Sequence, residues 1–363
     1  MSGLRRALGA ARRVVLAGTV ATGVSELVAR SEWRRQRLLV LCYHGVSIKD
    51  EHEWDRELFV TVAHLRRRCE ILARSGFKVL PLDEALRLRQ NGTLPPKSVV
   101  LTFDDGLSDF ARLAAPLLSE FGYPATVYVT TYYMDNQWPV APPIFSYLLW
   151  KAGERLLKFD WPEVHQTPDR TSSLLARRRG WVADLLRYAR ERNYSGPERW
   201  TLTQELADRL GVTPALESVV ANRVLYIMTD DELRRTAAAG FDVQLHTHRH
   251  RVPRNRDAFT AEIDQNRARL EALTGKSAQH FCYPSGVVYS ECLAWLAQNG
   301  VKSGVTCEPG LCSPADNPYL VPRFIDCAVH SDRVFASWLS GIGAVLRPAR
   351  SPFAISEDDA IAL

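Results

Sequence analysis

The sequence lacks the patterns of several common protein classes. Its seven cysteines are scattered and include no Cys-x-x-Cys pair, which argues against a zinc knuckle and against a disulfide framework. No apolar run approaches the roughly 20 residues that a membrane-spanning helix needs. There is also no internal repeat or low-complexity tract. We therefore expect a globular protein whose thiols stay reduced in a reducing compartment.

Positive charge is in slight excess and unevenly placed. The net charge of +5 is concentrated in the first 40 residues and around Arg177, Arg178 and Arg179. A groove for nucleic acid would spread basic residues across the whole fold, so we expect no nucleic-acid partner. The remaining composition is ordinary, and 363 residues are enough for one large α/β barrel or two smaller domains.

The first 37 residues form a basic segment that we expect to be helical. Four arginines precede a short apolar run at 14–24: Arg5, Arg6, Arg12 and Arg13. The run resembles part of an export signal but lacks an Ala-x-Ala cleavage site and leads directly into the first strand. We therefore favour an amphipathic helix lying on an anionic membrane surface, which would make the protein cytoplasmic or peripheral on the inner membrane face. An export signal and an ordinary helix packed on the fold remain the alternatives.

The body of the chain, 38–340, alternates strands with helices. Short apolar runs at 38–43, 98–103 and 125–129 predict buried strands, and helical patterns at 58–73 and 110–121 separate them. This alternation predicts an α/β fold with parallel pairing, either a barrel or a doubly wound sheet. Long charged helical stretches at about 144–228 predict a helical insertion. The alternation then resumes with a helix capped by Thr229, and 341–363 reads as a C-terminal tail.

Two polar motifs follow predicted strands. Thr-Phe-Asp-Asp-Gly ends at Gly106, and His-Thr-His-Arg-His runs from His246 to His250. Because the C-terminal ends of parallel strands meet at one rim, the two motifs can share a site. Two imidazoles and one carboxylate with a position open for water are typical of a hydrolytic zinc site. Of two adjacent aspartates, one can bind the ion while the other acts as a base.

Simpler interpretations of these motifs stay open. Asp-Asp-Gly is also a common exposed turn, and three histidines within five residues can be a surface cluster. An amidohydrolase would instead use His246 and His248 as an HxH pair on one face of a strand.

The two motifs resemble those of the polysaccharide deacetylase family (NodB homology, carbohydrate esterase family 4), which pairs TFDDG with H-[ST]-x-x-H. Further similarity covers Cys42–Val46 and Phe281–Gly286. The resemblance implies a distorted, incomplete (β/α) barrel. It makes Asp104 the general base, and it implies a divalent metal ion, zinc first with nickel or cobalt as alternatives, held by three ligands: Asp105, His246 and His250.

The chain also departs from the family pattern. Cys282 stands where many members carry an arginine, and we find no late strand ending in a catalytic histidine. The Phe-x-Tyr-Pro-x-Gly form is similar to that of poly-N-acetylglucosamine deacetylases, which use the histidine of an early Tyr-His motif as the acid. That role falls to His44 here. Substrate contacts and oxyanion donors are expected at four positions: Tyr283, Pro284, Ser285 and Arg323. Arg323 can also orient Asp104 or form an ordinary salt bridge.

The resemblance predicts a metal-dependent hydrolase that removes N-acetyl groups from an amino-sugar-containing glycan or glycolipid. Its partner would be an acetylated glycan or a lipid-linked sugar. A catalytically impaired carbohydrate-binding protein on the same barrel is the main alternative.

Overall fold

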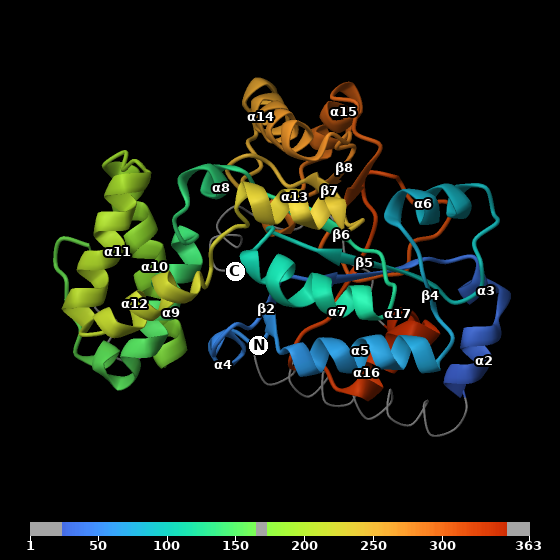
Figure 1. Cartoon of the computed structure of the whole chain (residues 1–363), viewed down its shortest axis with the longest axis horizontal. Helices are drawn as coiled ribbons and strands as arrows, with labels where there is room; N and C mark the ends of the chain where they lie inside the picture. Colours follow the sequence, from blue (N-terminus) through green and yellow to red (C-terminus); the bar gives the residue numbers. More distant parts are fainter. Residues whose placement is uncertain (1–23, 165–172, 347–363) are drawn as a thin grey trace.

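The centre of the molecule is a curled parallel sheet, seen in a computed structural model that describes residues 24–164 and 173–346 (Figure 1). Seven of its eight strands follow the order β10-β1-β5-β6-β7-β8-β9, and the eighth, β4, pairs with the start of β5. Their bounds are β1 Leu39–Tyr43, β4 Lys78–Val79, β5 Ser98–Phe103, β6 Thr126–Val129, β7 Asp242–Leu245, β8 His280–Cys282, β9 Ser303–Val305 and β10 Phe324–Ile325. The predicted α/β fold with an incomplete barrel is confirmed.

Both faces of the sheet are covered, which explains the continuous apolar runs of β1 and β5. Side chains alternate between the two faces. Val40, Val100 and Tyr128 belong to a small cluster with Cys282 and Val305, while the residues of the opposite face pack beneath the outer helices. Helix α6 (Leu82–Gln90) adds Leu82 and Ala85 to the small cluster. The small cluster is therefore the interior of the half-barrel, and α6 covers one end of it.

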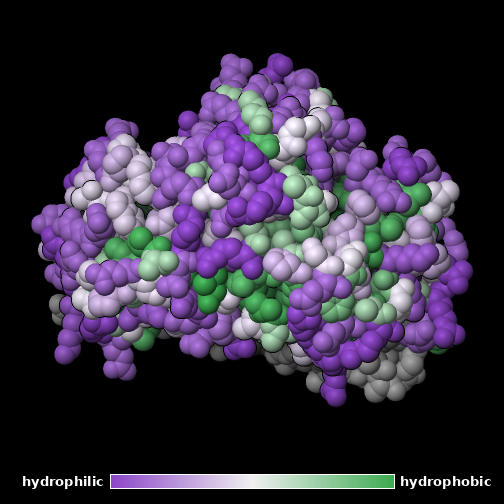
Figure 2. Space-filling view, viewed as in Figure 1, coloured by the Kyte–Doolittle hydropathy of each residue, from purple (hydrophilic) through white to green (hydrophobic). Residues whose placement is uncertain are grey.

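Amphipathic helices surround the sheet: α5 Val62–Arg74, α7 Ala115–Glu120, α13 Asp230–Ala238, α14 Arg256–Thr274, α15 Ser290–Gln298 and α16 Asp332–Ser340. The helix predicted at 110–121 starts with a π-helical turn, Phe110–Ala114, before α7. The cap predicted at Thr229 is present, because its hydroxyl accepts a hydrogen bond from the Glu232 N–H. On the face drawn in Figure 2, hydrophilic residues predominate around smaller hydrophobic patches, as expected where helices bury most of their apolar faces.

The helical insertion forms a separate lobe on the left of Figure 1. It comprises α9 Ala141–Ala152, the 3-10 turn Gly153–Leu157, α10 Leu174–Glu191, α11 Gly196–Leu210 and α12 Thr213–Asn222. The lobe thus begins and ends a few residues earlier than the predicted 144–228. Its α9 contacts α4 (Glu51–Trp54), where Trp54 donates to the Ser146 hydroxyl and Tyr147 to Asp50.

The lobe is also tied to the barrel where the chain returns. The N–H of Ser108 donates to the Tyr226 carbonyl, and that of Met228 donates to the Gly106 carbonyl. Leu107 and Ile227 pair between these two bonds in an antiparallel bridge. The returning chain therefore runs beside the segment that follows Asp105.

Both ends of the described chain are helical. Helices α2 (Val24–Arg30) and α3 (Glu32–Arg35) form the described part of the basic segment, and residues 1–23 lie outside it. The predicted tail is corrected at its start, because α17 (Ile342–Val345) follows Gly341 and packs on α16. Residues 347–363 lie outside the described part. Among the helices described, none has the length and apolar character to cross a bilayer.

Candidate metal centre and catalytic pocket

The pairing register places the motif residues side by side. Tyr43 at the end of β1 lies opposite Phe103 at the end of β5, so His44 and Asp104 follow at the same level. On the other side of the sheet centre, Leu245 of β7 pairs with Val129 of β6 and with Phe281 of β8. Residues from four strands therefore converge at one rim of the half-barrel, as in other parallel α/β barrels.

Asp105, His246 and His250 form a compact group of possible metal ligands. The Oδ1 atom of Asp105 lies 3.2 Å from Nε2 of each histidine. One ligand atom from each residue lies within 4.8 Å of the others. The backbone is left-handed at Asp105, with φ of 69°, and at Thr247 and His250, with φ of 60° and 54°. Such non-glycine conformations cost energy, and they concentrate at functional sites.

His246 is held in one orientation by neighbouring backbone and side-chain groups. Its ring is buried, and Nδ1 lies 2.9 Å from the Cys282 carbonyl. Because a carbonyl can only accept, Nδ1 carries the proton and Nε2 presents a lone pair toward Asp105. The backbone N–H of His246 donates to Asn266 on α14, whose side-chain NH2 donates in turn to the Val129 carbonyl.

The charge state of Asp105 also suits a metal site. Burial would raise the pKa of this carboxyl, but the neighbouring rings of His246 and His250 outweigh burial and hold the pKa well below its usual value. The group thus offers one anionic oxygen and two ring nitrogens, a donor set that fits zinc or a similar divalent ion. The residues present therefore fit the cofactor that the sequence predicts.

Asp104 faces a different environment from Asp105. It is buried, and Arg323 donates to both of its oxygens at 2.7 Å. The thiols of Cys42 and Cys282 lie 3.5 and 3.3 Å from its Oδ2. Burial alone would raise the pKa of Asp104, but the charge and hydrogen bonds of Arg323 hold it well below the usual range. Asp104 is therefore an ionised carboxylate that does not share the histidines of Asp105.

His44 lies beside this carboxylate. Its Nε2 atom is 3.8 Å from Oδ2 of Asp104, and 16% of its side chain is exposed. Its Nδ1 has no hydrogen-bond partner among the described residues. His44 is thus close enough to the base to act in the same pocket and is partly open to solvent.

His248 lies apart from the ligand group. Its Nδ1 is 2.8 Å from the Thr131 hydroxyl, and its ring packs edge-on against Tyr132 of α8 (Tyr132–Asn136). Burial and the charge of Arg249 lower its pKa. This position agrees with the motif register in which only the outer two histidines are ligands.

The four residues predicted to contact the substrate lie in different environments. Arg323 has no exposed surface and lies beneath Asp104, so it cannot touch a substrate from its present position. Tyr283 is also buried: its N–H donates to Val305 and its hydroxyl to the Tyr319 carbonyl. Pro284 has no N–H. Of the segment Tyr283 to Ser285, only Ser285, at a left-handed φ of 53°, keeps an N–H for an oxyanion.

A sequence model of the polysaccharide deacetylase family matches residues 91–155 and 206–304. The matched segments contain the ligand group and Asp104 and leave all of α10 and the first part of α11 in the lobe unmatched. Over these two segments the chain is similar to the polysaccharide deacetylase family.

Similar proteins agree with this finding. The poly-β-1,6-N-acetyl-D-glucosamine N-deacetylase of Escherichia coli K12 is 31% identical over 100 residues, which make up 27% of this chain and 15% of that protein. The match thus spans only a small part of the E. coli protein.

Solved structures of deacetylases share the fold of this chain. The deacetylase PplD of Streptococcus pyogenes, in complex with acetate, superposes with a TM-score of 0.54 at 19% identity, covering 81% of this chain and 94% of its own. IcaB from Ammonifex degensii gives 0.51 at 18% identity, covering 84% and 97%. At these identities the likeness concerns the fold alone.

Two features of the site escaped sequence analysis. Asn266 lies in the middle of a long helix, and no local pattern distinguishes it from an exposed polar residue. Cys282 was noted as a departure from the family, but its neighbours were not foreseen: Arg323 Nη2 contacts its sulfur at 3.3 Å. An arginine from just before β10 therefore occupies the pocket that Cys282 lines.

Proposed function

We propose that the chain is a metal-dependent hydrolase that removes N-acetyl groups from an amino-sugar-containing glycan or glycolipid. One observation carries the proposal: two successive aspartates have separate partners. Asp105 faces two histidine nitrogens, while Asp104 faces Arg323 and His44. The proposed metal-assisted hydrolysis uses this separation, because one carboxylate binds the ion while the other stays free to accept a proton.

The ion would be held by Asp105, His246 and His250. When bound, a divalent ion supplies Lewis-acid chemistry, polarising the acetyl carbonyl and making water more acidic. Zinc suits these donors best, with nickel and cobalt as alternatives. Asp104 accepts the proton of the attacking water. Arg323 keeps this carboxylate ionised and fixes its direction, so it acts as a positioning residue rather than a substrate contact.

Two further groups complete the reaction. His44, 3.8 Å from Asp104, protonates the departing amine. The N–H of Ser285 stabilises the oxyanion of the tetrahedral intermediate, because preorganised donors in a pocket of low polarity favour developing charge. The products are acetate and a free amine on the sugar.

The test is release of acetate from short acetylated glucosamine oligomers by the metal-loaded protein. The matched control is Asp104→Asn, which keeps the size of the side chain but removes its charge and its ability to accept a proton. We expect the variant to retain metal, to melt at a lower temperature because Arg323 loses its charged partner, and to lose about 10²–10⁴-fold in kcat when assayed below that temperature. Near-normal turnover by Asp104→Asn would remove Asp104 from the mechanism.

The two alternative functions are less well supported. An amidohydrolase with an HxH pair needs His248 in the ligand group, yet its Nδ1 lies at Thr131. A carbohydrate-binding protein without turnover has no need for a base held ionised by a fully buried arginine. Acetate release separates this alternative from the enzyme.

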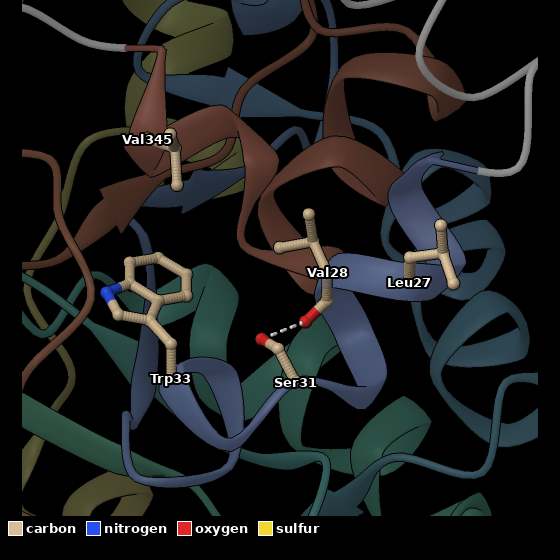
Figure 3. A pocket seen from close by; sticks show the side chains of 5 residues that line it. All are labelled: Leu27, Val28, Ser31, Trp33 and Val345. Carbon is tan, nitrogen blue, oxygen red and sulfur yellow. Dashed lines mark hydrogen bonds between the residues drawn. The ribbon is translucent and has the colours of Figure 1, made fainter.

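We also propose that α2 contacts an anionic membrane, a position that would suit either an acetylated glycan or a lipid-linked sugar as substrate. An apolar hollow of about 440 Å³ lies between α2, α3 and α17, lined by Leu27, Val28, Ser31, Trp33 and Val345 (Figure 3). Leu27 is 73% exposed and Val345 55% exposed. Four arginines precede α2 in the sequence, and segments that combine basic residues with apolar side chains favour anionic lipid. The seven free thiols agree with the reducing, inner side of that membrane.

A further inference from the structure

A second group of metal donors lies beside the proposed catalytic site. The Sγ of Cys42, a ring nitrogen of His44 and a carboxylate oxygen of Asp104 lie within 4.8 Å of one another. Cys42 and His44 are two residues apart on β1 and its extension, so their side chains point to the same face. Oδ2 of Asp104 is 3.5 Å from the thiol and 3.8 Å from Nε2 of His44.

This donor set differs in kind from the first. It contains sulfur, nitrogen and oxygen, whereas the Asp105 group contains nitrogen and oxygen alone. Thiolate with imidazole selects borderline-soft ions such as zinc, cobalt(II) and cadmium over magnesium and calcium. Burial raises the pKa of Cys42, so the thiol carries its proton until an ion displaces it.

The charges around this group can accept a dication. With the thiol deprotonated, Cys42 and Asp104 contribute two negative charges and Arg323 one positive charge, leaving the group net negative. Arg323 opposes binding, but it approaches Asp104 from the buried side. The ion would enter past His44, which is the most exposed of the three ligands at 16%.

We propose that Cys42, His44 and Asp104 form a second, inhibitory site for a thiophilic divalent cation. On binding, the thiol proton passes to solvent and the sulfur bonds the ion. The inhibition rests on the proposed function, since the ion occupies the oxygen of the base and the nitrogen of the acid. The protein then works only within a window of metal concentration: enough ion to fill the Asp105 group and too little to fill this one.

Binding is tested by titrating the metal-free full-length protein with cobalt(II) or cadmium. We expect two equivalents by equilibrium dialysis and a thiolate-to-metal charge-transfer band from one of them. Cys42→Ser should lose the band and weaken one equivalent on the order of 100-fold or more, because even an outer partner of a metal site is worth about 10–100-fold. His250→Ala should lose the other equivalent and keep the band.

Two controls separate binding from damage to the fold. Cys69→Ser changes a buried thiol on α5 outside the pocket and should keep both equivalents. Cys42→Ala should match Cys42→Ser, and circular dichroism checks that both variants fold. A wild-type protein without a thiolate band, or a band that survives in both Cys42 variants, overturns the site.

Inhibition is tested separately by acetate release in rising zinc. Each protein is compared with its own maximal rate. We expect wild-type activity to fall in excess zinc and Cys42→Ser to need at least about tenfold more zinc for the same loss. Equal zinc sensitivity would overturn the inhibitory role. If no variant releases acetate, the proposed function fails, while the charge-transfer titration still decides the second site.

Discussion

Arg323 and Asp104 form a fully buried, two-pronged ion pair, in which Nη1 donates to Oδ1 and Nη2 to Oδ2, each at 2.7 Å. The same guanidinium also donates to the Thr306 carbonyl and the Thr102 hydroxyl. The parallel geometry fixes the plane of the carboxylate as well as its charge. The direction in which Asp104 can accept a proton is thus set from inside the barrel.

Breaking this pair should be costly because it leaves one charge buried without its partner. We expect Arg323→Met to lower the free energy of unfolding by about 3–5 kcal/mol, and Asp104→Leu to do so by a similar amount. The double variant should lose clearly less than the sum of the two. Chemical denaturation of all four proteins measures this coupling. Strictly additive losses would show that the pair contributes no interaction of its own.

The effect of His44→Ala on kcat should depend on the substrate if His44 is the acid. If His44 protonates the amine, kcat on an N-acetyl sugar should fall by about 10²–10⁴-fold. An activated aryl acetate, whose leaving group needs no proton, should be affected far less. The comparison uses both substrates on the same metal-loaded preparation. Equal losses on the two substrates would demote His44 to a structural residue.

The ligand register can be tested by metal retention alone. We expect Asp105→Ala, His246→Ala and His250→Ala to lose the ion during dialysis, since each removes a ligand. His248→Ala is the matched control within the same motif and should keep it. Elemental analysis gives the outcome. An empty site in His248→Ala beside a full site in His250→Ala would revive the HxH pair.

Stability should fall at high pH through His330. Its Nδ1 lies 3.5 Å from Oδ1 of Asp326, which Arg68 also contacts. Burial lowers the pKa of His330, but hydrogen bonds to Asp326 and Cys327 outweigh burial and raise the pKa from 6.5 to about 9. Because the folded pKa is raised, the stabilisation is fully present below about pH 6.5 and is lost as pH rises through about 9.

The measurement is the melting temperature of wild type and His330→Gln across this range. The difference between them should be largest near pH 6.5 and should shrink toward pH 9 and above. His248→Gln, at a histidine whose pKa is lowered, is the control. A wild-type advantage that grows with pH would contradict the assigned sign.

Membrane contact predicts binding to anionic vesicles. The full-length protein should sediment with phosphatidylserine liposomes and less with neutral ones, and high salt should weaken the attraction. Leu27→Asp and Val345→Asp should each reduce sedimentation, while Val220→Asp, at an exposed valine on α12, should not. Equal sedimentation of all variants would show that the hollow is not the membrane contact and would favour another occupant, such as the chain's own ends or a second copy. Cleavage near residue 25 in an oxidising compartment would favour the export signal.

Much of the site was predictable because it lies in continuous sequence. Asp104 and Asp105 follow an unbroken apolar strand, and His246 follows another, so the rule that parallel strands end at one rim brought them together. The strand-helix alternation likewise predicted the α/β fold. Patterns formed by residues close together in the chain can be recognised in a single sequence.

For Arg323 the sequence left two roles open, orienting Asp104 or forming an ordinary salt bridge, and it could not choose between them. Arg323 precedes β10, a strand of two residues, Phe324–Ile325, which is too short for a recognisable pattern. Its partner Asp104 lies 219 residues away. Only the pairing of β10 with β1 brings them together, and nothing near Arg323 in the sequence announces that pairing. The π-helical turn that begins at Phe110 was also not predicted, because its hydrogen bonds join residues five apart instead of four and no residue type marks that change.

The clamp between Tyr226–Met228 and Gly106–Ser108 limits how the lobe can be exchanged. The chain that returns from the insertion is hydrogen-bonded to the backbone directly after Asp105. This returning segment is therefore part of the barrel, although it follows the insertion in the sequence. A chimaera that swaps the lobe must therefore cut before Arg223 and keep the clamp. Lobes of other sizes and surfaces can then replace this one while the turn that orients Asp105 is preserved. The lobe can therefore change in evolution without changing the catalytic residues.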